Sequence, residues 1–186
     1  MKAGLAKAVR ILTVPQLMAL MLILLMPEAF PGIDTWWAVF FLCLMPILAY
    51  PVCWAIPVLR KGGRARERML SIIFCVTGYV GGVLYGLLQR GTRTALAVYL
   101  TYLVSGILVA VFSYAIKIKG SGHACGAAGP IAMLVWQVSP WYLLGGAVLL
   151  AAVFWCSLTL KRHTWPQLFL GSAFPVGTIA LLAQVL

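Results

Sequence analysis

Long apolar stretches alternate with short polar segments along almost the whole chain. Each stretch is close to the roughly 20 residues that a helix needs to cross the hydrocarbon core of a bilayer. The pattern predicts seven such helices, at residues 11–30, 35–59, 69–88, 95–116, 123–138, 141–160 and 167–186. The sequence therefore predicts an all-α integral membrane protein, a bundle of six to seven transmembrane helices that forms one domain over residues 1–186.

Two of these stretches contain residues that should shape the bundle. The stretch 35–59 carries three prolines, Pro46, Pro51 and Pro57. Proline lacks the backbone N–H that a helix interior requires, so we expect this helix to be kinked or broken. The stretch 69–88 carries glycines at a spacing of four, which form a small-residue ridge that another helix can approach closely: Gly78, Gly82 and Gly86.

The composition excludes several classes of protein. The chain is 63% hydrophobic and 9% charged, with a mean hydropathy of +1.04, whereas soluble domains are about 45–50% apolar and about 25% charged. A soluble enzyme, a disordered chain and a secreted disulfide scaffold are therefore excluded. The five cysteines lie mostly inside apolar stretches and form no CxxC motif, which favours buried free thiols.

The charge is strongly positive, with 14 Lys and Arg against 3 Asp and Glu. The cations stand in short clusters between apolar stretches, which is typical of membrane loops, so no nucleic-acid partner is expected. If all seven predicted helices cross, one side collects 12 of the 14 cations: Lys2, Lys7, Arg10, Arg60, Lys61, Arg64, Arg66, Arg68, Lys117, Lys119, Lys161 and Arg162. The positive-inside rule predicts that this side, with the N-terminus, is cytoplasmic.

Both histidines of the chain fall on this cationic side, where a polar segment meets the start of a predicted helix. His123 follows a Gly-Ser-Gly segment and His163 follows Lys161-Arg162. Imidazoles that change protonation near neutral pH, surrounded by cations and helix N-termini that attract anions, indicate phosphate-ester chemistry. Glu67 is the sole carboxylate on this side, so neither a metal nor another cofactor is expected.

Each feature taken singly has a plainer interpretation. An interfacial histidine is commonly a tolerated polar residue, the RKGGRARER segment at 60–68 is commonly a topology signal, and Gly-Ser-Gly is commonly a flexible turn. Their convergence on one face, at the starts of helices, favours a functional site.

Three short segments occur in order along the chain. The first has Lys61 and, after six residues, Arg68. The second, at 120–123, reads Gly-Ser-Gly-His. The third has His163 and, after three residues, Gln167, followed by Gly171. They resemble the first motif, the second motif (Pro-Ser-Gly-His) and the second half of the third motif of the type 2 phosphatidate phosphatase superfamily, and the resemblance covers roughly residues 60–175.

The chain departs from the family pattern at several positions. Met69 and Gly120 stand where the first two motifs have proline. Cys156-Ser157 occupies the Ser-Arg position of the third motif, so that phosphate-binding arginine is absent. The neighbouring Arg162 or Lys161 is a candidate substitute.

Gln167 stands where the family has the Asp that orients the nucleophilic histidine. An amide can orient an imidazole but does not stabilise imidazolium as a carboxylate does. Three explanations stay open: the chain is slow, Glu67 supplies a carboxylate, or the chain belongs to a branch that works with Gln. His163–Gln167 fits a membrane-bound branch that carries His-Thr-x-x-Gln.

The resemblance implies a phosphatase that forms a phosphohistidine. His163 would attack phosphorus, oriented by Gln167, and His123 would protonate the leaving oxygen. The phosphoryl oxygens would be held by Lys61, Arg68, Lys117, Lys119, Ser121, Gly122 and Arg162. A site at head-group level suits a lipid phosphate or diphosphate of the polyprenyl or phosphatidate type. Two alternatives remain from the sequence: a small transporter or channel that binds anions, and a catalytically inactive relative that holds a lipid phosphate.

Overall fold

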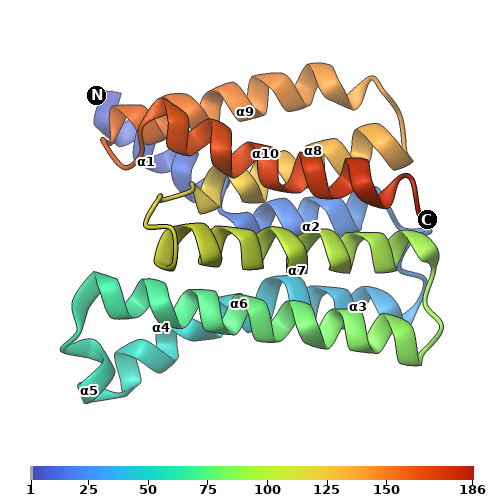
Figure 1. Ribbon diagram of the computed structural model, residues 1–186, viewed down its shortest axis with the longest axis horizontal. Helices are drawn as coiled ribbons and strands as arrows, with labels where there is room; N and C mark the ends of the chain where they lie inside the picture. The colour runs from blue at the N-terminus through green and yellow to red at the C-terminus, as the bar shows by residue number, and fades with distance from the viewer. Residues whose placement is uncertain (1) are drawn as a thin grey trace.

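The computed structural model describes residues 2–186, without the side chains at positions 60, 64 and 65, and over this range the chain is all-α. The elements follow the chain in the order α1 Lys2–Leu12, α2 Pro15–Leu25, α3 Ile33–Val39, the π-helical segment η1 Phe40–Leu44, α4 Met45–Ala55, α5 Pro57–Arg60, α6 Gly63–Leu88, α7 Arg93–Tyr114, α8 Gly122–Gln137, α9 Tyr142–Thr159 and α10 Trp165–Leu182. The helices run roughly along one common axis, and the two termini lie at opposite ends of the bundle (Figure 1).

Five segments are long and apolar enough to cross a membrane: 33–55, 66–88, 93–114, 142–159 and 165–182. The bent pair of α1 and α2 makes a sixth if it counts as one span. The prediction of an all-α, multi-pass membrane bundle is confirmed. The helix predicted at 123–138 is present as α8, but its 16 residues extend about 24 Å, less than the ~30 Å core of a bilayer. α8 is instead largely enclosed by protein, and nine of its residues are buried.

The prediction of one continuous N-terminal helix over residues 11–30 is wrong in its bounds, because that range holds the end of α1 and then α2, Pro15–Leu25, as a separate helix. The chain forms α1 and α2, which meet at an angle of 50°. Pro15 opens α2, and Val14 before it is extended, with φ −63° and ψ 145°, because the proline ring disfavours helical geometry in the preceding residue. α1 is amphipathic: it buries Ala6 and exposes charged and apolar side chains on its other faces.

The break predicted within 35–59 is confirmed. The segment divides into α3, the π-helical segment, α4 and the short α5. The π-helical segment comes just before Pro46, which lies in the first turn of α4, and the chain breaks again at Ile56, whose backbone is extended before Pro57. Both breaks follow from the missing N–H of proline and from its restriction of the preceding residue.

Glycines set the closest approaches between elements. A Cβ at Gly78 would lie 2.5 Å from the carbonyl oxygen of Phe41, and one at Gly82 would lie 2.5 Å from the ring of Tyr99. The predicted glycine ridge of α6 therefore contacts two different neighbours, the π-helical segment and α7. Gly126 of α8 likewise allows Pro15 to approach closely, because a Cβ at this glycine would lie 2.6 Å from the proline ring.

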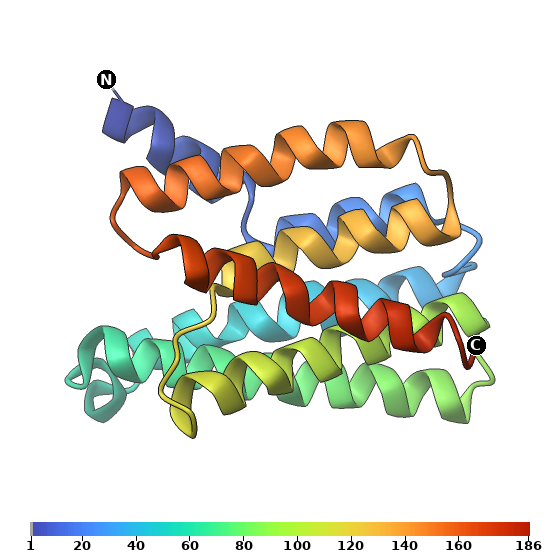
Figure 2. The same cartoon turned by 45° about the horizontal axis from the view of Figure 1, so that its top comes forward.

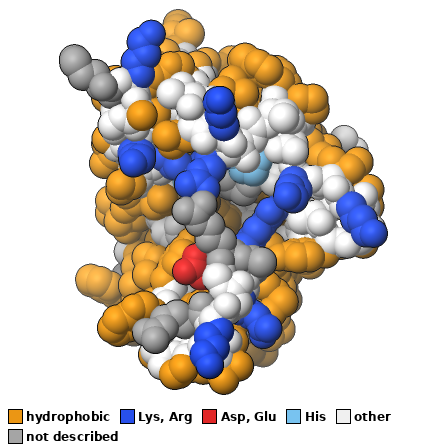
Figure 3. All heavy atoms as spheres, turned by 90° about the vertical axis from the view of Figure 1, so that its left-hand side faces the viewer, with side chains coloured by type: hydrophobic (Ala, Val, Ile, Leu, Met, Phe, Trp, Pro, Cys, Tyr) orange, Lys and Arg blue, Asp and Glu red, His pale blue; other side chains and the backbone are white. Residues whose placement is uncertain are grey.

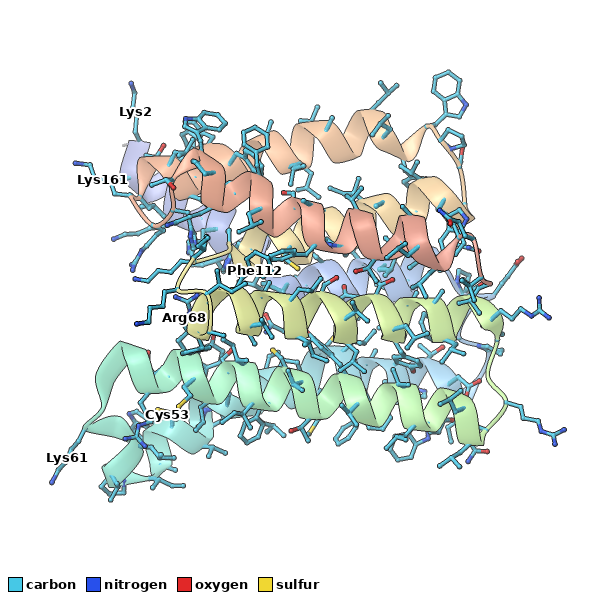
Figure 4. All side chains as sticks on the ribbon, in the orientation of Figure 1. Lys2, Cys53, Lys61, Arg68, Phe112 and Lys161 are labelled. Atoms are coloured by element: carbon cyan, nitrogen blue, oxygen red, sulfur yellow. The ribbon has the colours of Figure 1, made fainter. Side chains whose placement is uncertain are left out.

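One end of the bundle collects polar and cationic groups. Lys2, Lys61, Arg68 and Lys161 all lie at this end, on the left of Figure 4. The view onto this end shows many Lys and Arg side chains, with histidine visible between them and apolar side chains around the rim (Figure 3). We call it the cationic end. The first motif was expected in a loop, but its arginine lies on a helix, because α6 already begins at Gly63 and Arg68 is in its second turn.

Candidate functional site

A cavity of about 510 Å³ lies at the cationic end, enclosed by parts of α1, α6, α7, α8 and the segment before α10. It brings together both histidines of the chain, His123 and His163. Three arginines from three different parts of the chain line it with them: Arg10, Arg68 and Arg162. Figure 2 shows how the start of α8 and the segment before α10 approach each other at this end of the bundle. The two histidines therefore share one cavity, although 40 residues separate them in the sequence.

The cavity continues from the arginines into the bundle between α6, α7 and α8. Its inner wall is formed mainly by apolar and aromatic side chains, among them Ile72, Val76, Tyr79, Tyr102 and Val109. Along α6, the lining extends about 16 Å from the charged end to its deepest tyrosine, at a rise of about 1.5 Å per residue. The cavity thus joins a cationic mouth to a mostly apolar interior.

A capping box at the start of α10 fixes the tautomer of His163. The side-chain oxygen of Gln167 accepts from the backbone N–H of Thr164 at 3.3 Å. The same oxygen lies 3.2 Å from Nδ1 of His163. Since the oxygen is already placed as an acceptor by an N–H that can only donate, Nδ1 of His163 must donate to it. Nε2 then carries the free lone pair, as a nucleophile requires.

Ser121, which was expected to hold a phosphoryl oxygen, is not among the residues that line the cavity and is instead part of the scaffold that holds His123. Its side chain is fully buried and caps α8 by accepting from the N–H of Ala124 at 3.3 Å. Its own N–H donates to the carbonyl of Gln167 at 3.0 Å. A Cβ at Gly171 would clash with the Ser121 backbone, so this glycine allows α10 to approach the segment. These contacts join the second and third motifs directly.

Arg68 points toward the end of α7. Its Nη2 donates to the hydroxyl of Ser113 at 3.1 Å, which fixes one edge of the guanidinium. The neighbouring Glu67 is exposed and also lines the cavity, so it provides a carboxylate at the site.

Burial keeps both histidines neutral at neutral pH. For His123, burial is the largest cause and the charge of Arg10 the second, and together they lower the pKa to about 4. For His163, burial lowers the pKa most, and the hydrogen bond to Gln167 opposes it. Charges on Arg10, Arg68 and Lys119 lower it further. The site thus presents two neutral imidazoles within a positive field.

Not every residue expected at the site lines the cavity. Lys61 is exposed and extends away from it at the far edge of the cationic end (Figure 4), because the turn before α6 directs it outward while Arg68 lies on the helix. Lys117 and Lys119 are exposed on the segment between α7 and α8 and are not among the lining residues. The prediction that Lys61 points into the cavity together with Arg68 is therefore corrected for Lys61.

The residue that the sequence reasoning missed is Arg10. The sequence places it only among the topology signals at the N-terminus, yet its side chain lines the cavity and its Nη1 is buried with no hydrogen-bond partner among the described residues. An arginine spaced three residues after Lys7 on an amphipathic helix has no motif to mark it. The bend at Pro15 was the only available signal that this helix turns over the site.

Among the described residues, no group of three or more His, Cys, Asp or Glu side chains is arranged to hold a metal ion. The five cysteines are free, and each is buried or half-buried. The side-chain groups that line the cavity include imidazole, guanidinium, hydroxyl, carboxylate and the thiols of Cys75 and Cys125.

Comparison with models of known protein families gave no match, and neither the curated proteins nor the solved structures gave one.

Proposed function

We propose that the protein is a membrane-embedded, metal-independent phosphatase that hydrolyses a lipid phosphate or diphosphate through a phosphohistidine. One observation carries the proposal: both histidines share a cavity with three arginines, and one of them, His163, has its Nδ1 committed to Gln167. The resemblance of the three motif segments to the type 2 phosphatidate phosphatases supports the same chemistry.

The reaction begins when the phosphoryl group enters between the histidines. Nε2 of His163 donates its lone pair to phosphorus as the bond from phosphorus to the leaving oxygen breaks. Arg68 and Arg162 hold the equatorial oxygens, and this positioning and charge stabilisation provide most of the catalysis. A water molecule then attacks the phosphohistidine and releases inorganic phosphate.

His123 manages the protons in both steps. Its pKa of about 4 leaves it neutral at pH 7 before substrate binds. A phosphoryl dianion beside the ring opposes the arginine charges and raises the pKa of His123. Substrate binding therefore protonates His123, which makes it a general acid. The protonated ring gives its proton to the leaving oxygen and then accepts one from the attacking water.

The shape of the cavity favours an amphiphilic substrate. The cationic mouth suits the phosphate, and the mostly apolar interior between α6 and α7 suits the start of a hydrocarbon chain. Both polyprenyl and phosphatidate-type phosphates satisfy this description.

Phosphate release by the detergent-purified protein tests the proposal, using phosphatidate, phosphatidylglycerol phosphate and polyprenyl phosphates in the presence of a chelator. His163→Ala should abolish release because it removes the nucleophile. His123→Ala should cost about 10²–10⁴-fold on lipid phosphates, but much less on p-nitrophenyl phosphate, whose leaving group needs little protonation. Arg93→Ala, at the opposite end of the bundle, is the matched control and should keep full activity.

Retained turnover in His163→Ala would exclude the phosphohistidine. Binding of lipid phosphate without release by the wild-type protein would identify an inactive binder instead. Transport of phosphate across proteoliposomes without hydrolysis would favour the transporter.

A further inference from the structure

Arg10 lies in the last turn of α1, directly above the site. Its side chain is half-buried and lines the same cavity as His123 and His163. Its Nη1 is buried and has no hydrogen-bond partner among the described residues. A guanidinium always carries its charge, so a buried, unpaired N–H of this group is costly unless a ligand satisfies it.

The surroundings of Arg10 make this cost larger. Arg162 lines the same cavity, and among the described residues of the lining Glu67 is the only acidic one. Two like charges that line one cavity repel each other. An anion between them reverses the sign of both interactions, and a phosphoryl group also offers the fork-shaped guanidinium two acceptor oxygens.

The position of α1 also places Arg10 near the residues at which this chain departs from the third motif. α1 packs along α9, which carries Cys156 and Ser157 in its last turns. These two residues occupy the motif's Ser-Arg position. Both are fully buried, and the Ser157 hydroxyl has no hydrogen-bond partner among the described residues. The place where the motif would carry its arginine is thus occupied by a small side chain beneath α1.

We propose that Arg10 is a phosphate-binding residue, supplied by the N-terminal helix in place of the arginine that the third motif lacks. The inference rests on the proposed function only in its choice of ligand class, a phosphoryl group. It assigns α1 to the binding site, held there by the bend at Pro15 and by the close packing of Pro15 against Gly126. Arg162 then remains a second cation of the site and not the substitute for the missing arginine.

The test uses the full-length protein in detergent and two readouts, kcat/KM on a lipid phosphate and the Kd for orthovanadate, which imitates a phosphoryl group without turnover. Arg10→Gln keeps the length and polarity of the side chain but removes its charge. We expect it to lower kcat/KM and raise the vanadate Kd by about 10²-fold, as loss of one oxyanion-binding donor does. Arg10→Lys restores the charge without the fork-shaped pair of N–H donors. Its kcat/KM and its vanadate Kd should therefore lie within about tenfold of the wild-type values.

Lys7→Gln is the matched control, because it removes the same charge from an exposed position on the same helix. It should leave both readouts unchanged. If Arg10→Gln binds vanadate as tightly as Lys7→Gln does, the inference is overturned, even when hydrolysis has fallen.

A pH profile separates binding from a merely structural role. The charge of Arg10 lowers the pKa of both histidines. Arg10→Gln should therefore move the acid limb of the kcat/KM profile to higher pH, whereas a variant that only loosens α1 lowers the curve without moving it.

The two proposals fail in different ways. A wild-type protein that binds vanadate without hydrolysing any lipid phosphate overturns the phosphatase proposal, while the Arg10 comparison still decides the inference. A wild-type protein that neither binds vanadate nor releases phosphate overturns both.

Discussion

Gln167 connects the helix scaffold to the chemistry through a single oxygen atom. That oxygen completes the capping box of α10 and also accepts from Nδ1 of His163. An amide in this place fixes the ring and its tautomer without adding charge. The neutral imidazole that results suits a nucleophile, and the surrounding arginines are left free to bind the phosphate.

Replacing this amide by a carboxylate tests its role. Gln167→Glu keeps the length of the side chain and therefore both hydrogen bonds. The added charge beside Nδ1 raises the pKa of His163, so the acid limb of the pH–rate profile should move to higher pH while turnover above pH 8 is preserved. Gln167→Leu removes the hydrogen bond and should lower kcat about 10²–10⁴-fold. A Gln167→Leu variant with wild-type kcat would contradict the orienting role.

His123 predicts how stability depends on pH. Burial, and then Arg10, hold its folded-state pKa at about 4, below the ordinary value of about 6.5. The unfolded chain therefore binds the proton first as the pH falls. The contribution of the neutral His123 ring to the free energy of unfolding is complete above about pH 6.5. It is lost progressively as the pH falls toward 4, and the loss is about 3 kcal/mol in all. Thermal unfolding in detergent should show this decline, and His123→Gln should reduce its slope. An equal slope in both proteins would contradict the assignment.

At the scale of elements, α8 and α10 act as one unit. Both helices begin at the cationic end, α8 with the Ser121 cap and α10 with the Thr164 capping box, and the hydrogen bond from the Ser121 N–H to the Gln167 carbonyl joins them. Gly171 is the position that permits this approach, because any Cβ there meets the Ser121 backbone.

Gly171→Ala should therefore separate the two histidines. The added methyl forces the segment 120–122 away from α10, and we expect a loss of about 1–3 kcal/mol in unfolding free energy together with a loss of kcat/KM. Gly177→Ala is the control on the same helix, since a Cβ there meets nothing within 4 Å. It should be neutral or slightly stabilising, because alanine favours a helix interior over glycine. Thermal unfolding and activity measured on both variants check the prediction, and equal behaviour would contradict it.

At the scale of the whole molecule, charge is segregated along the bundle axis. Lys2, Lys61, Arg68 and Lys161 lie at one end (Figure 4), and Arg90 and Arg93 follow the opposite end of α6. Between the two ends, large apolar side chains cover the outside, as a surface in contact with lipid requires.

The excess of cations predicts that the cationic end faces the cytoplasm. A membrane-impermeant maleimide should label Gln89→Cys in intact cells and should label Lys61→Cys only after permeabilisation. The wild-type chain serves as the background, because its cysteines are buried or half-buried. Labelling of Lys61→Cys from outside would reverse the orientation.

The sequence by itself determined most of the elements and the ends of the bundle, but not the bend between α1 and α2. Apolar stretches of nearly constant length define the helices, since a helix satisfies its own backbone within four residues and its pattern is therefore local. The prolines of 35–59 located the breaks for the same reason. The two histidines were identified because each adjoins a polar segment at a helix start.

Only the tertiary structure decided which cations line the cavity. Lys61 fits a motif but points away, and Arg10 fits none but lines the cavity. The choice depends on where α1 turns at Pro15, on how closely Gly126 and Gly171 let neighbouring elements approach, and on the outward turn before α6. These are contacts between residues far apart in the chain, and side-chain packing in three dimensions fixes them, so no local spacing along the sequence records them.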